Sequence, residues 1–184
     1  DVVKGITIPP LPRKDPPPMH EVEDIILNSY TNGPNIKYSP GDNAFWSPQN
    51  DTISLPLREQ FKSTEEHLDT LFHELVHSTG SVDRLNRKDL LDLDKYGTHR
   101  DVRAREELIA EIGSAIISSM FGINTSIENV AAYVQSWKQF LEDDPNALFE
   151  AASLASKAVD WILAGYYEDN PDEEYDPENQ PGAV

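Results

Sequence analysis

An apolar stripe with helical spacing, between residues 63 and 80, constrains the fold of this chain more than any other feature. Its members recur at the i, i+3, i+4, i+7 and i+8 positions of a helix. They are Leu68, Leu71, Phe72, Leu75 and Val76. Ser63 and Glu66, just ahead of the stripe, have the spacing of a capping box, which predicts the start of this helix. A helix with one wide apolar face must pack on other elements, so the pattern predicts a folded domain built around it.

The other side of the same predicted helix carries two histidines and a glutamate in the stretch "LFHELVHSTG". His73 and His77 are one turn apart and project from the same face, so both imidazoles can reach one metal ion about 2 Å from each ring nitrogen. Glu74 lies about 100° further round the helix axis, where it can touch a metal-bound water rather than the metal. The alternative is a chance match, in which the histidines make ordinary hydrogen bonds.

A catalytic metal site of this kind needs a third protein ligand, and the chain offers two candidates. Glu107 and Glu111 are spaced i, i+4 on a second predicted helix, from about Ala104 to Phe121, and therefore share a face. Small side chains surround them and predict a close approach to another helix; these are Ala110, Gly113, Ser114 and Ala115. In the alternative interpretation, the two acids only solvate one face of a helix in a chain that is acidic overall.

Composition excludes several classes of protein. The chain has no cysteine, so disulfides and thiolate-bound metals are excluded and a metal must be held by His, Asp or Glu. The formal net charge of -18 disfavours direct binding of nucleic acid through a basic face. No run of about 18 apolar residues and no signal peptide are present, which predicts a soluble, cytoplasmic protein without a membrane partner. Because the chain begins at Asp1, we expect it to be a piece of a longer or processed protein.

Composition also divides the chain into three parts. Residues 1–20 hold six of the fourteen prolines and are predicted to form an extended arm or linker. Residues 167–184 carry seven acidic residues and no Lys or Arg, which predicts a solvated, disordered tail. Residues 21–166 are therefore expected to form the folded domain.

Within residues 21–166, the pattern predicts an α+β domain in which helices dominate. A short helix is expected near residues 21–30, and two more near residues 126–141 and 145–164. Turn signals at residues 40–43 and 48–51 separate three short β-prone runs, which predicts a small antiparallel meander. The predicted strands are Ile36–Tyr38, Ala44–Trp46 and Thr52–Leu55.

Two patterns in the chain, a short one within a long one, resemble known metallopeptidases. The helix "EELIAEIG" resembles the N-E-x-x-x-D-I-F-G helix of thermolysin-like zincins, in which the glutamate ligates zinc and the following acid orients a ligand histidine. This resemblance implies Glu107 as the third ligand, and Glu111 as the partner that fixes the tautomer of His73 or His77. A longer pattern covers about residues 36–164 and resembles the zincin-like metallopeptidase domain of ArdC-type antirestriction proteins. It consists of "LFHELVHSTGSVDRLNR", "YGT", "AREELIAEIGSAII", "FGI" and "NVAAYVQSWKQFLEDDPNALFEAASLASKAVDWIL".

The ArdC resemblance implies a fold and a context. The fold is zincin-like, with a small antiparallel sheet packed on a predominantly helical core. Proteins of that family are carried by plasmids and other mobile elements, and this domain usually follows an N-terminal domain that binds single-stranded DNA. The chain resembles the C-terminal half of such proteins, and its proline-rich start is interpreted as the remnant of an interdomain linker.

The implied function is zinc-dependent hydrolysis of peptide bonds in a peptide or protein substrate. With Zn²⁺ held by two histidines and Glu107, a bound water would become a nucleophile near neutral pH. Glu74 would accept the proton of that water and pass it to the leaving amine. Tyr96 and His99, between the two metal-bearing helices, are candidate donors to the oxyanion, with packing and solvation as their alternative roles. The donor set does not separate Zn²⁺ from other divalent ions.

Further expectations concern residues around the site. Zincins commonly bind substrate as an added strand, and "DTISLP" is the candidate edge, with an ordinary terminal strand as the alternative. Arg84 and Arg87 are expected to pin the loop after the histidines by ion pairs. His67 is expected at the surface, and His20 has no assigned role. Three aromatic side chains at helical spacing are expected in the core: Trp137, Phe140 and Trp161.

Two other functions are compatible with these patterns. A strongly acidic antirestriction protein could imitate the charge of DNA and occupy the basic groove of a nuclease, with a metal site that is structural only. A third possibility is a processing protease that acts on its own polyprotein or on a host regulator.

Overall fold

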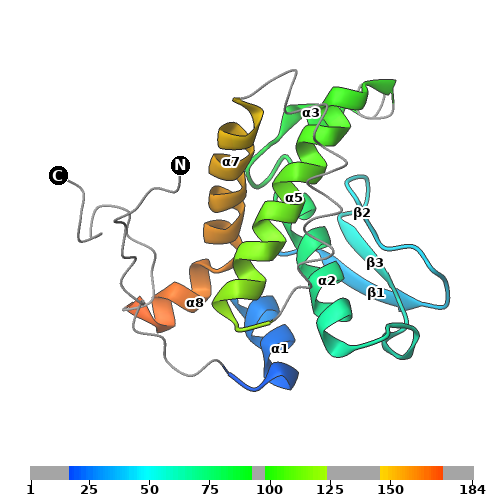
Figure 1. The fold of residues 1–184 in the computed structure, drawn as a ribbon, viewed down its shortest axis with the longest axis vertical. Helices are drawn as coiled ribbons and strands as arrows, with labels where there is room; N and C mark the ends of the chain where they lie inside the picture. Colours follow the sequence, from blue (N-terminus) through cyan, green and yellow to red (C-terminus); the bar gives the residue numbers. More distant parts are fainter. Residues whose placement is uncertain (1–16, 93–97, 124–145, 172–184) are drawn as a thin grey trace, which may run out of the picture.

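The computed structural model describes residues 17–92, 98–123 and 146–171, and Figure 1 shows how their elements are arranged. The first half contains α1 (Met19–Ser29), β1 (Asn35–Ser39), β2 (Phe45–Ser47), β3 (Thr52–Pro56) and the 3-10 turn η1 (Arg58–Gln60). The helices that follow are α2 (Thr64–Ser78), α3 (Lys88–Leu91), α5 (Arg100–Met120), α7 (Ala147–Ile162) and α8 (Ala164–Asp169). The predicted α+β class with a dominant helical part is confirmed. The predicted helix at 126–141 lies outside the described residues.

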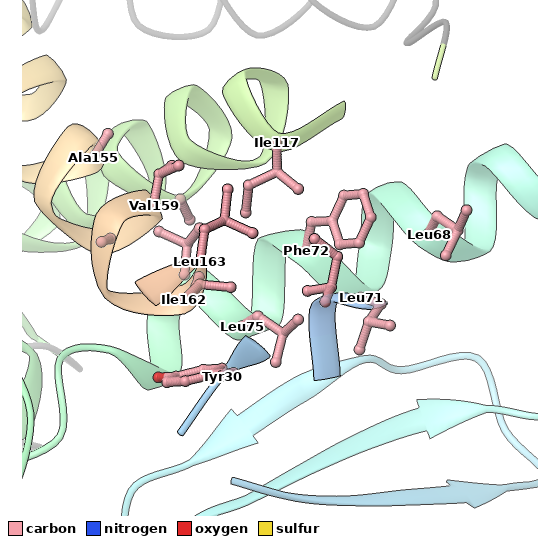
Figure 2. Packing of buried hydrophobic residues seen from close by; sticks show 14 of the residues in the cluster. Tyr30, Leu68, Leu71, Phe72, Leu75, Ile117, Ala155, Val159, Ile162 and Leu163 are labelled. Carbon is pink, nitrogen blue, oxygen red and sulfur yellow. The ribbon is translucent and has the colours of Figure 1, made fainter. Parts of the chain in front are cut away.

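Helix α2 lies at the centre of the domain, with the sheet on one side and α5 and then α7 on the other (Figure 1). The side chain of Ser63 accepts a hydrogen bond from the Glu66 N–H at 3.2 Å, which confirms the predicted start of the helix. All five residues of the apolar stripe are buried. Figure 2 shows stripe residues Phe72 and Leu75 in one cluster with Ile117 of α5 and Val159 of α7. The stripe therefore fixes α2 against both neighbours.

The three-stranded sheet differs from the predicted antiparallel meander. The strands lie within about a residue of their predicted positions, but their order is β1-β3-β2, with β3 parallel to β1 and antiparallel to β2. Because β3 lies between β1 and β2, the loop that joins β1 to β2 crosses the end of the position that β3 occupies. Gln60 holds this loop by two hydrogen bonds with the Gly41 backbone. The meander and the edge position of "DTISLP" are therefore wrong, because β3 is central and buried along most of its length.

Helices α2 and α5 approach each other closely at Gly113. A Cβ atom added to Gly113 would lie 2.7 Å from Cγ2 and 3.0 Å from Cγ1 of Val76. Both atoms belong to a stiff β-branched side chain in the buried core, so they have little room to move. The small-sided surface predicted for this helix is thus used for close packing.

Replacing Gly113 with Ala is expected to destabilise the domain by about 1–3 kcal/mol, because the overpacking outweighs the gain in helix propensity. The measurement is the urea midpoint of unfolding. Ser119→Ala, on an exposed position of the same helix, is the control and should change stability by no more than about 0.5 kcal/mol. A Gly113→Ala protein as stable as the wild type would contradict this account of the packing.

A polar cluster ties the N-terminal half of α2 to the rest of the fold. His67 is only 4% exposed, which corrects the expected surface position, and its Nε2 lies 2.9 Å from the hydroxyl of Tyr38 on β1. The Tyr38 hydroxyl donates to Glu23 of α1, which also accepts from Arg58 at 2.7 Å. Burial lowers the pKa of His67, so this histidine is neutral at physiological pH. Helical spacing did not predict this burial, because the elements around His67, β1 and α1, lie far from it in the sequence.

The aromatic expectations have different outcomes. Trp161 on α7 is 37% exposed, so its expected core position is wrong. The α7 face that packs inward is made of smaller side chains: Ala151, Ala155, Ala158, Val159 and Ile162. Trp137 and Phe140 lie outside the described residues. Among the helices of the described ranges, none has the length and apolar character needed to cross a membrane.

Candidate metal centre

Three ligand atoms from α2 and α5 converge at the interface of these helices. His73 Nε2 lies 3.0 Å from His77 Nε2 and 3.4 Å from Glu107 Oε2, and His77 Nε2 lies 3.8 Å from the same oxygen. Ligands about 2.0–2.1 Å from a tetrahedral ion are separated by about 3.3 Å, and the three distances bracket this value. Together the atoms form the kind of group that can hold one metal ion.

Each histidine has an acidic partner on α5 for its other ring nitrogen. His73 Nδ1 lies 3.3 Å from Glu111 Oε1, and His77 Nδ1 lies 3.1 Å from Glu106 Oε1. An Nδ1–H that donates to a carboxylate leaves the Nε2 lone pair for a metal. Residues 106, 107 and 111 therefore place three carboxylates of one helix around the histidine pair.

Glu106 contacts the candidate site, and the sequence patterns did not predict this. It follows Arg105 and precedes Glu107, so its position indicated only another solvated acid of an acidic chain. In the structure it is 5% exposed. The only signal in the sequence was the presence of Arg87, a cation able to pair with a buried carboxylate.

Arg87 binds Glu106 with a forked contact. Its Nε–H donates to Glu106 Oε2 at 2.9 Å and its Nη2 donates to Oε1 at 2.6 Å. The same guanidinium donates to the Thr79 hydroxyl and to the carbonyls of Val76 and His77 at the end of α2. The predicted ion-pairing role of Arg87 is confirmed.

Arg84 forms a second forked ion pair, with Asp51 in the turn between β2 and β3. Its two terminal nitrogens donate to Asp51 Oδ1 and Oδ2 at 2.9 and 2.5 Å, and one of them also donates to the Ser78 carbonyl. Trp46 donates its indole N–H to Asp51 Oδ1 at 3.0 Å. The predicted ion pair of Arg84 is therefore present, and it links the end of α2 to the sheet.

Glu74 is held beside the three converging atoms by the edge of the sheet. It is 7% exposed, and its Oε2 accepts a hydrogen bond from the backbone N–H of Trp46 at 2.8 Å. That contact directs one carboxylate oxygen to β2 and leaves the other for a substrate or a water. Trp46 lies on β2, which pairs with β3 along one edge and directs the Trp46 N–H to Glu74 from the other edge.

The two predicted oxyanion donors have different outcomes. Tyr96 lies outside the described residues. His99 is the residue just before α5; it is exposed, and its Nδ1 lies 3.0 Å from the Thr98 hydroxyl. The role of His99 as a donor stays a prediction.

The neighbouring carboxylates raise the pKa of both histidines. Burial by itself would lower the pKa of His73, but hydrogen bonds to Glu107 and Glu111 outweigh it and raise this pKa to about 10. Burial opposes a raised pKa at His77 too, and Glu106 and Glu107 outweigh it there. The same contacts hold the pKa of Glu107 far below its usual range despite burial. Without metal, His73 therefore holds a proton at neutral pH.

Metal binding is expected to release about one proton or more per ion at pH 7, because an imidazole that ligates a metal must be deprotonated at Nε2. The His73 pKa of about 10 lies above this pH, so the metal-free site holds that proton and apparent affinity rises as pH rises toward 10. Isothermal titration with Zn²⁺ in buffers of different ionisation enthalpy measures the number released. A binding enthalpy that is the same in every buffer would contradict the prediction.

Comparisons with known proteins show which family the chain is similar to. A family model described as zincin-like metallopeptidase matches residues 21–154. Two DNA primases named TraC from Escherichia coli are 40% and 39% identical to the chain over 157 and 159 residues. Each match covers 85% of the chain but only 10% and 14% of the respective primase, so the chain spans a small part of these relatives.

Solved structures of the antirestriction protein ArdC from plasmid R388 are similar in fold. The Mn(II)-bound structure has a TM-score of 0.66 and 31% identity, over 88% of this chain and 58% of that one. The metal-free structure of the same protein gives a TM-score of 0.62, over 86% and 53% of the two chains. The predicted resemblance to ArdC-type proteins is confirmed. From its sequence match and its fold together, the chain belongs to the zincin-like metallopeptidase family.

Proposed function

We propose that this chain is a metal-dependent peptidase domain that hydrolyses peptide bonds. One observation carries the proposal: two Nε2 atoms and one carboxylate oxygen converge, with a buried Glu74 held beside them by the Trp46 N–H. His73, His77 and Glu107 would hold the ion. When bound, a divalent ion supplies Lewis acidity toward the oxygens of water and of a peptide carbonyl.

The chain's own residues account for proton transfer and positioning. Glu74 is the proposed general base, since its second carboxylate oxygen can take a proton from the attacking water and deliver it to the leaving amine. Glu106 and Glu111 hold the two imidazoles in the tautomer that presents Nε2. His99 and Tyr96 are proposed as donors to the oxyanion, a role that rests on their position in the sequence between α2 and α5.

The proposed substrate is an extended peptide that adds to the edge of β2. The Trp46 N–H points to Glu74, so the edge of this strand faces the site. Phe45, the neighbouring residue on β2, is 51% exposed and offers apolar contact to a peptide side chain. Strand addition on β2 would place the peptide backbone beside the proposed base.

Cleavage of a protein-derived peptide mixture tests the proposal. New termini should appear in mass spectra when the metal-loaded chain is added, disappear with an uncharged chelator, and return when Zn²⁺ is restored. If no peptide is cut by a chain shown to contain bound metal, the peptidase proposal is wrong for this chain acting alone.

Zn²⁺ is the proposed resident ion, because two histidines and one glutamate form a donor set typical of catalytic zinc sites. Mn²⁺ is the competing candidate, since the similar ArdC protein was solved with Mn(II). Metal analysis of protein purified without added metal decides between them. Stoichiometric manganese without zinc would contradict the proposed ion but not the site.

Antirestriction by charge mimicry is the second candidate. The chain has 33 acidic and 15 basic residues, and a similar solved protein is an antirestriction protein. In this alternative, the acidic surface would occupy the DNA-binding groove of a nuclease without hydrolysis. High salt should then abolish function, because screening weakens contacts between exposed charges.

A further inference from the structure

The guanidinium of Arg87 joins three parts of the metal centre. It is buried, with a relative side-chain exposure of 7%. It contacts the carboxylate of Glu106, the Thr79 hydroxyl, and the last carbonyls of α2 at Val76 and His77. One side chain therefore fixes both the backbone that carries His77 and the acid that accepts from its ring.

A continuous hydrogen-bonded path leads from Arg87 through Glu106 to the imidazole ring of His77. The fork fixes both oxygens of Glu106, and one of them, Oε1, also faces His77 Nδ1 at 3.1 Å. The position of that oxygen sets the rotation of the imidazole ring and holds the hydrogen on Nδ1. The ring rotation in turn sets where Nε2 points.

The absence of a side chain at Gly80 leaves space for this guanidinium. A Cβ atom on Gly80 would lie 3.2 Å from Cζ of Arg87 and 2.5 Å from Cδ2 of Leu90. Gly80 follows Thr79, the C-cap residue of α2, close to the helix carbonyls to which the arginine donates. A lysine at position 87 could enter this space, but its ammonium lacks the planar fork that holds both oxygens of one carboxylate.

We infer that Arg87 is a positioning residue of the metal centre, acting through Glu106 to aim His77 Nε2 at the ion. This inference rests on the proposed metal site at His73, His77 and Glu107, but not on peptide hydrolysis. It extends the site to a residue that contacts neither metal nor substrate.

A double-mutant cycle on Zn²⁺ affinity tests the inference. The full chain is prepared metal-free as wild type, Arg87→Lys, Glu106→Gln and the double variant, and the Zn²⁺ Kd of each is measured by competition with a chromophoric chelator. Each single variant is expected to weaken binding by about 10- to 100-fold. The Zn²⁺ Kd of the double variant should be about that of the single variant with the higher Kd, because both changes break the same hydrogen-bonded path.

Arg84→Lys is the matched control. Arg84 is equally buried in the same loop and also makes a forked ion pair with a carboxylate, but with that of Asp51 on the sheet side. It should lose stability while its Zn²⁺ Kd stays within about twofold of the wild type, since its path does not reach a ligand. Circular dichroism confirms that each variant is folded.

The outcomes separate this inference from the proposed site. If wild type does not bind Zn²⁺, or His77→Ala binds it equally well, the site itself is wrong and the inference falls with it. If only His77→Ala loses the ion, while folded Arg87→Lys keeps the wild-type Kd or the two changes add independently, the inference alone is wrong. Should Arg87→Lys fail to fold, Glu106→Gln decides, and an unchanged Kd overturns the inference.

Discussion

Glu74→Gln is expected to abolish detectable peptide hydrolysis while the divalent ion stays bound. Removal of a general base typically costs about 10²- to 10⁴-fold in rate. The amide oxygen of glutamine can still accept from the Trp46 N–H, so the local structure is retained. The residues that would hold the ion, His73, His77 and Glu107, are unchanged. The measurement is cleavage rate beside metal content for the same preparation.

The control for this variant is Glu59→Gln, which removes the same charge from an exposed residue in η1. It should cleave at the wild-type rate. The result also separates the two candidate functions. A Glu74→Gln protein that keeps full antirestriction activity, with that activity destroyed by high salt, would favour charge mimicry over catalysis.

His77→Ala is expected to remove both the ion and the stability that the ion confers. A ligand that binds only the folded state stabilises it by RT ln(1 + [L]/Kd), which is about 2.7 kcal/mol when the free ion is at 100 times its Kd. The wild-type Tm should therefore rise when Zn²⁺ is added, and the Tm of the variant should not. Thermal unfolding with and without Zn²⁺, beside metal analysis, measures both effects.

His67→Ala is the matched control on the same helix. His67 is as buried as His77 but contacts Tyr38 rather than the metal-site residues. Its loss should lower stability, because the hydroxyl of Tyr38 loses a partner. The rise in Tm on adding Zn²⁺ should nevertheless remain. A His77→Ala protein that still shows this rise would place the ion elsewhere.

The helical part of the fold and its histidine pair could be predicted from local patterns. The apolar stripe of α2 has a period that only a helix satisfies, and that period alone puts His73 and His77 one turn apart. The close approach at Gly113 followed from side-chain size, since small residues on α5 leave space for a second helix. In each case the determining residues lie within one element.

The features that local patterns did not predict depend on contacts between distant segments. The β-prone runs and turns located the strands, but nothing local determines which strand becomes the centre of the sheet, and β3 took that place. The sequence of β3, "TISLP", alternates polar and apolar residues as a half-buried strand does, so it did not indicate that this strand is buried along most of its length. Likewise, Glu106 differs from a solvated acid through its contacts with Arg87 and His77, which lie 19 and 29 residues earlier.

Helix α2 is fastened at both ends. His67 joins it to β1 near its start, while Arg84 and Arg87 hold its last carbonyls. A helix anchored in this way has little freedom to adjust the spacing of its two imidazoles. Glu107 comes from α5, and its side chain is 37% exposed, so it has more room to swing. Ions of different radius would therefore be accommodated mainly by movement of the Glu107 carboxylate, while the two imidazoles keep their positions.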